Sequence, residues 1–130
     1  MQDQEKIIKQ IVELASVEPE VDVLWLYGSR ARSNASVDSD FDLAIAFKSF
    51  VDSPIERRLR PELLALDWQK KLGLEISIVD FNQAPIQLAY TIVKDNCVIF
   101  SRNDFRLMTE EQKVMSKWEL DHLYHQEHYA

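Results

Sequence analysis

Two aspartates stand at alternate positions where an apolar run begins, in the segment Asp40-Phe41-Asp42. Alternate side chains of an extended chain point to the same face, so the two carboxylates repel each other unless a cation neutralises them. Magnesium takes oxygen ligands, typically a few carboxylates together with substrate phosphates and water. Asp40 and Asp42 are therefore predicted to bind a divalent cation, while Phe41 points the other way and anchors the strand.

A glycine-serine pair, Gly28-Ser29, ends the preceding apolar run and is the second candidate element of the site. Glycine lets the backbone approach a phosphate closely, and the serine hydroxyl and the following amides can donate to phosphate oxygens. Arg30 and Arg32 follow at once, and a guanidinium can pair with phosphate oxygens in bidentate fashion. The sequence predicts Gly28, Ser29 and Arg30 as phosphate-binding residues.

A third acid, Glu75, lies in the alternating segment LEISIV, on the side opposite Ile76. If the strand of Glu75 lies beside that of Asp40 and Asp42, the three carboxylates form one cluster. Such a cluster can hold two metal ions about 3.5–4 Å apart, which activate an attacking oxygen and stabilise a leaving one. Asp40, Asp42 and Glu75 are the predicted catalytic and metal-binding residues.

The elements that must position these residues alternate along a chain of 130 residues, a length that fits one domain, 1–130. Helical periodicity predicts helices, and apolar or alternating runs predict strands. The expected helices cover 5–15, 53–73, 82–96 and 104–130, and the expected strands cover 21–28, 40–47, 74–81 and 97–101. This order predicts an α/β or α+β fold with a small sheet covered by helices, and a long C-terminal helix, 104–130, available for docking a partner.

Smaller signals refine these elements. Ser53 is a candidate N-cap, Gly73 a helix stop, and Pro61 a residue that can split or kink the helix between them. Asp38 and Ser39 are expected to shape the turn before the carboxylate pair rather than to touch a metal.

Three histidines in the C-terminal helix, His122, His125 and His128, do not share one helix face. At 3.6 residues per turn, His128 lies about 120° away from His122 around the helix. They are read as part of a polar tail and not as a metal site.

The charge balance limits the choice of partner. The formal net charge is −7, and an acidic surface repels a long nucleic acid. A nucleotide remains possible because metal ions can carry it past the negative field. The single cysteine, Cys97, excludes an internal disulfide, and no signal-peptide core or apolar run of about 20 residues is present. These features predict a cytoplasmic protein that is not inserted in a membrane.

Gly28-Ser29, ten further residues and then Asp40-Phe41-Asp42 give the pattern G-S-x10-D-x-D. This pattern resembles that of the polymerase-β-like nucleotidyltransferase superfamily. GSRARSNASVDSDFDLAI is similar to its minimal nucleotidyltransferase (MNT) branch, and LEISIVDFNQAP is similar to that branch's third-carboxylate strand and turn. Many relatives have an aspartate and a glycine where this chain has Glu75 and Ser33.

The resemblance implies a polymerase-β-like fold with a mixed sheet, ATP as the donor and Mg²⁺, as two ions, at Asp40 and Asp42. It implies Glu75 as third metal ligand and candidate base. In that family the antitoxin transfers AMP to a tyrosine of a HEPN-domain ribonuclease toxin and silences it, which would make the HEPN toxin the partner of this chain. Two alternatives remain open: an antitoxin that acts by binding alone, and a small-molecule nucleotidyltransferase.

Overall fold

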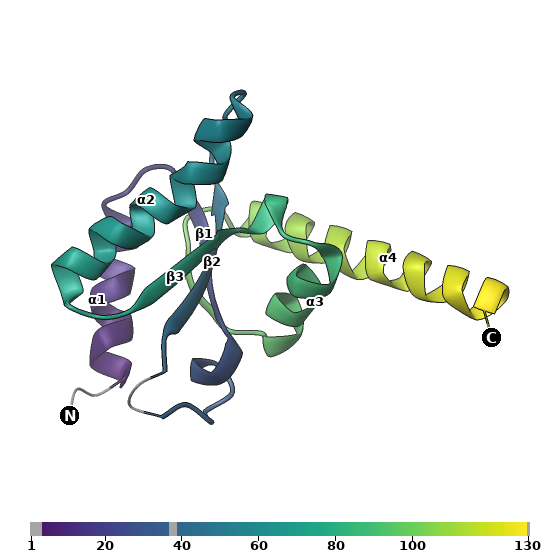
Figure 1. Ribbon diagram of the computed structural model, residues 1–130, viewed down its shortest axis with the longest axis horizontal. Coiled ribbons are helices and arrows are strands. Elements are labelled where there is room, and N and C mark those ends of the chain that lie inside the picture. The colour runs from purple at the N-terminus through teal and green to yellow at the C-terminus, as the bar shows by residue number, and fades with distance from the viewer. Residues whose placement is uncertain (1–3, 37–38, 130) are drawn as a thin grey trace.

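Four helices and four strands follow one another along the residues that the computed structural model describes, 4–36 and 39–129, with β1 and β2 consecutive (Figure 1). The helices are α1 (Gln4–Ser16), α2 (Pro54–Leu72), α3 (Ile86–Asp95) and α4 (Asp104–Tyr129). The strands are β1 (Val21–Tyr27), β2 (Phe41–Phe47), β3 (Ile76–Asp80) and β4 (Val98–Ser101). The predicted order of elements is confirmed. No helix in the described ranges is long and apolar enough to cross a membrane.

The strands form one mixed sheet in the order β3-β2-β1-β4. β1 is antiparallel to both β2 and β4, whereas β2 is parallel to β3. In this register Tyr27 pairs with Asp42 across β1 and β2, and Asp42 pairs with Ser77 across β2 and β3. The end of β1 and the starts of β2 and β3 therefore meet at one edge of the sheet.

Helices cover both faces of the sheet, with α1 and α2 on one side and α3 and α4 on the other (Figure 1). Leu43 and Ile45 of β2 belong to the core cluster beneath α1 and α2. Ala44 and Ala46 belong to the cluster beneath α3 and α4. The predicted alternation along β2 is confirmed, and it places Asp42 on the side of α3 and α4.

The predicted caps of α2 are confirmed. The Ser53 hydroxyl accepts a hydrogen bond from the Glu56 backbone N–H (3.3 Å), and Gly73 ends the helix in the left-handed conformation with φ +68°. Pro61 lies inside the helix and is buried, yet α2 continues on both sides of it. Of the two effects considered for this proline, a split of the helix does not occur.

The two acids expected inside strands lie just outside them. Asp40 and Glu75 each precede the first residue of a strand by one position. In the loop before β2, the Ser39 hydroxyl accepts a hydrogen bond from the Ser36 backbone N–H (3.0 Å), as the turn prediction requires. Asp38 and the side chains of His125 and His128 lie outside the described residues, so their predicted roles stay predictions.

Ion pairs hold the opposite edge of the sheet together. The Arg106 guanidinium donates to the Phe47 carbonyl (3.1 Å), to Glu110 Oε1 (3.0 Å) and to Asn82 Oδ1 (2.8 Å). Arg60 stacks over the Phe47 ring at 4.0 Å and pairs with a carboxylate of β3. A cavity of about 470 Å³ adjoins these residues. Because both guanidinium groups already pair with carboxylates, we assign this region to packing.

Candidate functional site

Gly28 makes a tight elbow directly after β1. A single 3-10 turn covers Gly28–Arg30, and Gly28 has φ +75°, a conformation that favours glycine. A Cβ atom at this position would lie 2.7 Å from Asp42 Oδ2, closer than side chains pack. Glycine is therefore needed here both for its backbone angle and for the close approach of the elbow to the Asp42 carboxylate.

The carboxylate pair lies beside this elbow. Asp42 is partly buried and Asp40 is exposed. Burial raises the pKa of Asp42 above its usual value, and the neighbouring Asp40 carboxylate raises it further. The repulsion expected from the sequence is thus present, and a divalent cation would relieve it. The donor set of this pair fits a hard cation.

Tyr27 is a site residue that the sequence did not single out. It lies opposite Asp42, and burial together with the Asp42 charge raises the pKa of Tyr27 to about 12. The phenol therefore stays protonated at neutral pH. Strand periodicity puts Tyr27 in β1, but only the pairing of β1 with β2 places it at Asp42.

The backbone of Glu75 lies beside that of the Asp40/Asp42 pair. The Phe41 backbone N–H donates to the Glu75 carbonyl (3.1 Å), while the Glu75 side chain is exposed. The residue level with Asp42 on β3 is Ser77. Among the side chains that the structure describes, those of residues 4–36 and 39–124, no three of His, Cys, Asp or Glu are grouped so that they could hold a metal ion. The structure thus groups Asp40 with Asp42 and puts Glu75 at the start of the adjacent strand.

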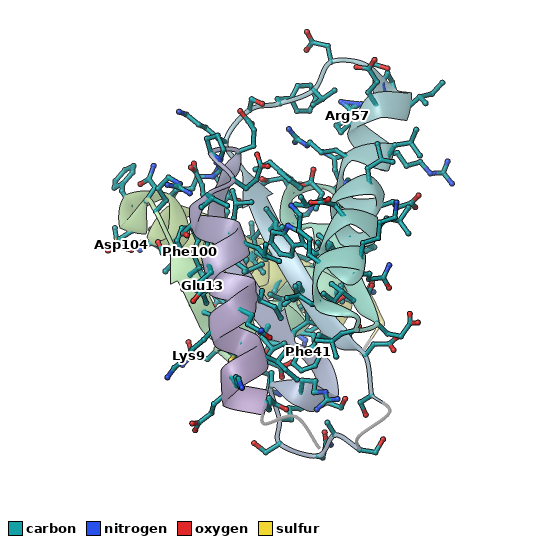
Figure 2. All side chains as sticks on the ribbon, turned by 90° about the vertical axis from the view of Figure 1, so that its left-hand side faces the viewer. Lys9, Glu13, Phe41, Arg57, Phe100 and Asp104 are labelled. Atoms are coloured by element: carbon teal, nitrogen blue, oxygen red, sulfur yellow. The ribbon has the colours of Figure 1, made fainter. Side chains whose placement is uncertain are left out.

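Arg30 has contacts that differ from its predicted role in phosphate binding. Its Nη2 donates to the Ser39 carbonyl (2.8 Å), and its guanidinium stacks 4.3 Å above the Phe41 ring. Phe41 packs in the core beneath α1 and α2, on the face opposite Asp42. Figure 2 shows Phe41 on this side, at the end of the molecule away from Arg57. Arg30 therefore supports the loop before β2.

Arg32 is the guanidinium beside the elbow. Its side chain is 52% exposed, and its Nη1 lies 3.6 Å from Asp95 Oδ1. The other Asp95 oxygen, Oδ2, accepts a hydrogen bond from the Gly28 backbone N–H (3.0 Å). The sequence analysis did not single out Asp95 because it lies 67 residues from Gly28 along the chain. No local pattern links the two positions.

The site is strongly negative. Asp42 and Asp95 lie against Gly28, Asp40 lies near Asp42, and α3 ends at Asp95, so the negative end of its helix dipole lies nearby. A polyphosphate would be repelled from this edge unless cations accompanied it. A glycine elbow, a carboxylate pair and an exposed guanidinium together suit a nucleotide that arrives with a divalent cation.

Comparison with known families agrees with this class of site. The family described as polymerase beta, nucleotidyltransferase, matches residues 9–105, which is well over half of the chain. The chain therefore belongs to the polymerase beta nucleotidyltransferase family. No curated protein is significantly similar to it in sequence.

Solved structures show the same fold. A toxin–antitoxin complex with AMP-PNP superposes with a TM-score of 0.72 at 20% identity, covering 96% of this chain and 94% of that one. The MNT antitoxin in complex with a tri-AMPylated HEPN toxin of Shewanella oneidensis gives 0.72 at 18% identity, covering 95% and 93%. The toxin–antitoxin complex MntA-HepT gives 0.71 at 18% identity, with the same coverage. The predicted polymerase-β-like fold is confirmed.

Proposed function

We propose that this chain is an MNT antitoxin that transfers AMP from ATP to a tyrosine hydroxyl of a cognate HEPN ribonuclease toxin. The observation that carries the proposal is the Asp40/Asp42 pair set against the Gly28 elbow. Two structures of the same fold add support, since one contains AMP-PNP and another contains an AMPylated toxin. We infer that the antitoxin and its toxin act in the cytoplasm.

The proposed roles follow from position. Gly28 and Ser29 bind the β- and γ-phosphates, with Arg32 rather than Arg30 as the nearby guanidinium. Asp40 and Asp42 would hold Mg²⁺, as two ions, and the exposed Glu75 carboxylate would join them as the third ligand only when the ions are bound. When bound, these ions would neutralise the triphosphate and lower the pKa of the acceptor hydroxyl.

The transfer step itself conserves atoms and charge. The tyrosine oxygen bonds to the α-phosphorus of ATP while the bond from that phosphorus to the α,β-bridging oxygen breaks. Pyrophosphate leaves with the electron pair of the broken bond. The hydroxyl of a free tyrosine has a pKa of about 10. Its proton passes to the exposed Glu75 carboxylate. The chain contributes mainly alignment and charge neutralisation.

The acceptor needs a docking surface, and we propose that the C-terminal helix, within 104–130, supplies it. In Figure 1 α4 extends well beyond the sheet. Its outer part exposes Leu120, Leu123 and Tyr124. In this proposal residues 1–130 form one nucleotidyltransferase domain, and the toxin brings its tyrosine to the site from outside.

Intact-mass measurement of the toxin tests the proposal. After incubation with this chain, ATP and Mg²⁺, the HEPN toxin should gain one or more AMP units on tyrosine. With Asp42→Asn, which removes the metal-binding charge, the toxin should remain unmodified. An unmodified toxin in the wild-type reaction would refute AMP transfer.

Ser77 favours one alternative. Because an uncharged residue stands level with Asp42 on β3, the site has one fewer carboxylate at that position than a three-acid cluster needs. An antitoxin that neutralises its toxin by binding alone fits this observation. It predicts that Asp40→Ala with Asp42→Ala leaves neutralisation intact, whereas AMP transfer predicts that neutralisation is lost.

A further inference from the structure

Asp95 lies at a position that is unfavourable for a carboxylate, and its own helix gains nothing from it. It is the last residue of α3, where the helix dipole disfavours a negative charge. Its side chain is only 8% exposed, so its carboxylate has also lost most of its hydration. A residue that destabilises its own helix in two ways needs a compensating contact elsewhere.

One compensating contact is in the elbow and the other is to the guanidinium beside it. Asp95 Oδ2 accepts the Gly28 backbone N–H at 3.0 Å, and Oδ1 pairs with Arg32 at 3.6 Å. A hydrogen bond from an amide to a carboxylate is about twice as strong as a neutral one. Asp95 thus ties together the glycine turn and the nearby guanidinium.

The backbone around α3 brings Asp95 to this place. Asn96 adopts the left-handed conformation, φ +51°, which ends the helix and reverses the chain. The Leu26 backbone N–H then donates to the Cys97 carbonyl (2.8 Å), beside β1. This bond fixes the end of α3 against the end of β1. Asp95 lies two residues before Cys97 and Gly28 lies two residues after Leu26, so the two residues meet.

We propose that Asp95 is a positioning residue that preorganises the elbow for the triphosphate. It holds the Gly28 turn beside Asp42 and orients Arg32, whose pair with Asp95 involves Nη1 of a half-exposed guanidinium that carries five N–H donors in all. Arg32 can therefore bridge Asp95 and the nucleotide without breaking its ion pair. This inference rests on the nucleotide-binding part of the proposed function.

The test is the affinity for AMP-PNP in excess Mg²⁺, measured by calorimetry on the full chain, with Tm recorded for every variant. Asp95→Ala, which removes both contacts, should weaken binding at least about tenfold, equivalent to about 1.4 kcal/mol. Asp95→Asn keeps an oxygen for the Gly28 N–H and should fold, but should still lose about threefold or more because Arg32 is no longer held by charge. Asp67→Ala removes the exposed ion pair with Lys71 (2.9 Å) and should leave the affinity unchanged.

A double-mutant cycle separates positioning from fold stability. If Asp95 acts through Arg32, the losses from Asp95→Asn and Arg32→Gln should be less than additive. Wild-type affinity in Asp95→Ala, even with a lowered Tm, would overturn this inference but not the nucleotide-binding proposal. Full additivity of the two changes would do the same. Absence of AMP-PNP binding by the wild-type chain would overturn the nucleotide-binding proposal and this inference with it.

Discussion

At the scale of single residues, Asp42 shows the sharpest conflict between folding and function. It is partly buried, lies near Asp40 and opposes Tyr27, and both burial and the Asp40 charge raise its pKa. A carboxylate in such surroundings destabilises the metal-free protein. Residues of this kind are common where a site must bind a cation or transfer a group.

Replacing Asp42 should therefore separate stability from activity. Because the pKa of Asp42 is higher in the folded than in the unfolded chain, the folded state binds more protons between these two values. Stability falls as pH rises through this window, and at pH 7 the wild type bears the full penalty. Asp42→Asn should equal or exceed the wild-type Tm at pH 7 in EDTA, and its advantage should vanish below about pH 4.

The same variant should lose AMP transfer by more than about 100-fold, as expected when a transition-state contact is removed. Thermal unfolding over a pH series, with transfer measured in parallel by intact mass, checks both effects. A variant clearly less stable than wild type at pH 7 in EDTA would contradict the assignment of Asp42 as a strained site residue.

Ser77 offers a gain-of-function test. Ser77→Asp should place a carboxylate level with Asp42 and tighten Mn²⁺ binding about tenfold, because affinity rises with ligand charge. It should also lower the Tm of the metal-free protein. The exposed Ser116→Asp on α4 adds the same charge away from the site and should do neither. Unchanged Mn²⁺ affinity in Ser77→Asp would show that this position does not face the metal site.

At the scale of elements, the elbow between β1 and the loop before β2 determines whether the site can form. Gly28 and Gly73 both adopt positive φ, at +75° and +68°. Only Gly28 faces a neighbour, since a Cβ there would meet Asp42 Oδ2 at 2.7 Å, whereas nothing lies within 4 Å at Gly73. The two glycines form a natural matched pair.

Gly28→Ala and Gly73→Ala should each cost about 1–2 kcal/mol of stability, from the left-handed conformation alone. Gly28→Ala should in addition abolish AMP-PNP binding, because the new methyl group displaces the Asp42 carboxylate. Gly73→Ala should bind AMP-PNP like wild type. Chemical denaturation and calorimetry measure the two effects, and equal AMP-PNP affinities for the two variants would contradict the elbow assignment.

The sequence predicted what depends on local pattern and missed what depends on pairing. Alternation along β2 was sufficient to place Asp42 on the face opposite Leu43, and the caps of α2 followed from their residue types. Strand register was not accessible, so the position level with Asp42 was not recognised as Ser77. Asp95 was missed for the same reason, because its contact with the elbow is set by how α3 and β4 pack.

Arg30 illustrates a second limit. Its place next to Gly28-Ser29 suggests a phosphate contact, but the direction of a side chain does not follow from its position in the sequence. The 3-10 turn sends its side chain toward Phe41 and Ser39, whereas Arg32, two residues later, lies beside Asp95.

At the scale of the whole molecule, exposed apolar surfaces on α4 and on α2 are available for a partner. The outer part of α4, a helix that extends beyond the sheet (Figure 1), exposes Leu123 and its neighbours, and α2 exposes a stripe that includes Leu63 and Leu66. Exposed apolar surface of this kind marks interaction sites. The proposed function assigns toxin docking to α4.

Leu123→Asp should weaken toxin binding by about tenfold or more, since burying an unpaired charge at an interface is costly, and should leave AMP-PNP affinity unchanged. Leu66→Asp is the matched control, because the two side chains are 52% and 55% exposed. Calorimetry with purified toxin checks both variants. Loss of toxin binding in Leu66→Asp alone would move the docking surface to α2.

Nucleotide binding at the Asp40/Asp42 edge is what all these roles require, and titration of the chain with AMP-PNP tests it most directly. We expect one AMP-PNP per chain in excess Mg²⁺, with affinity reduced at least about tenfold by EDTA or by Asp42→Asn. Lys113→Ala, in the cavity at the opposite edge of the sheet, should leave affinity unchanged. Binding that is insensitive to Mg²⁺ and Asp42, or that is lost with Lys113→Ala, would contradict this location of the site.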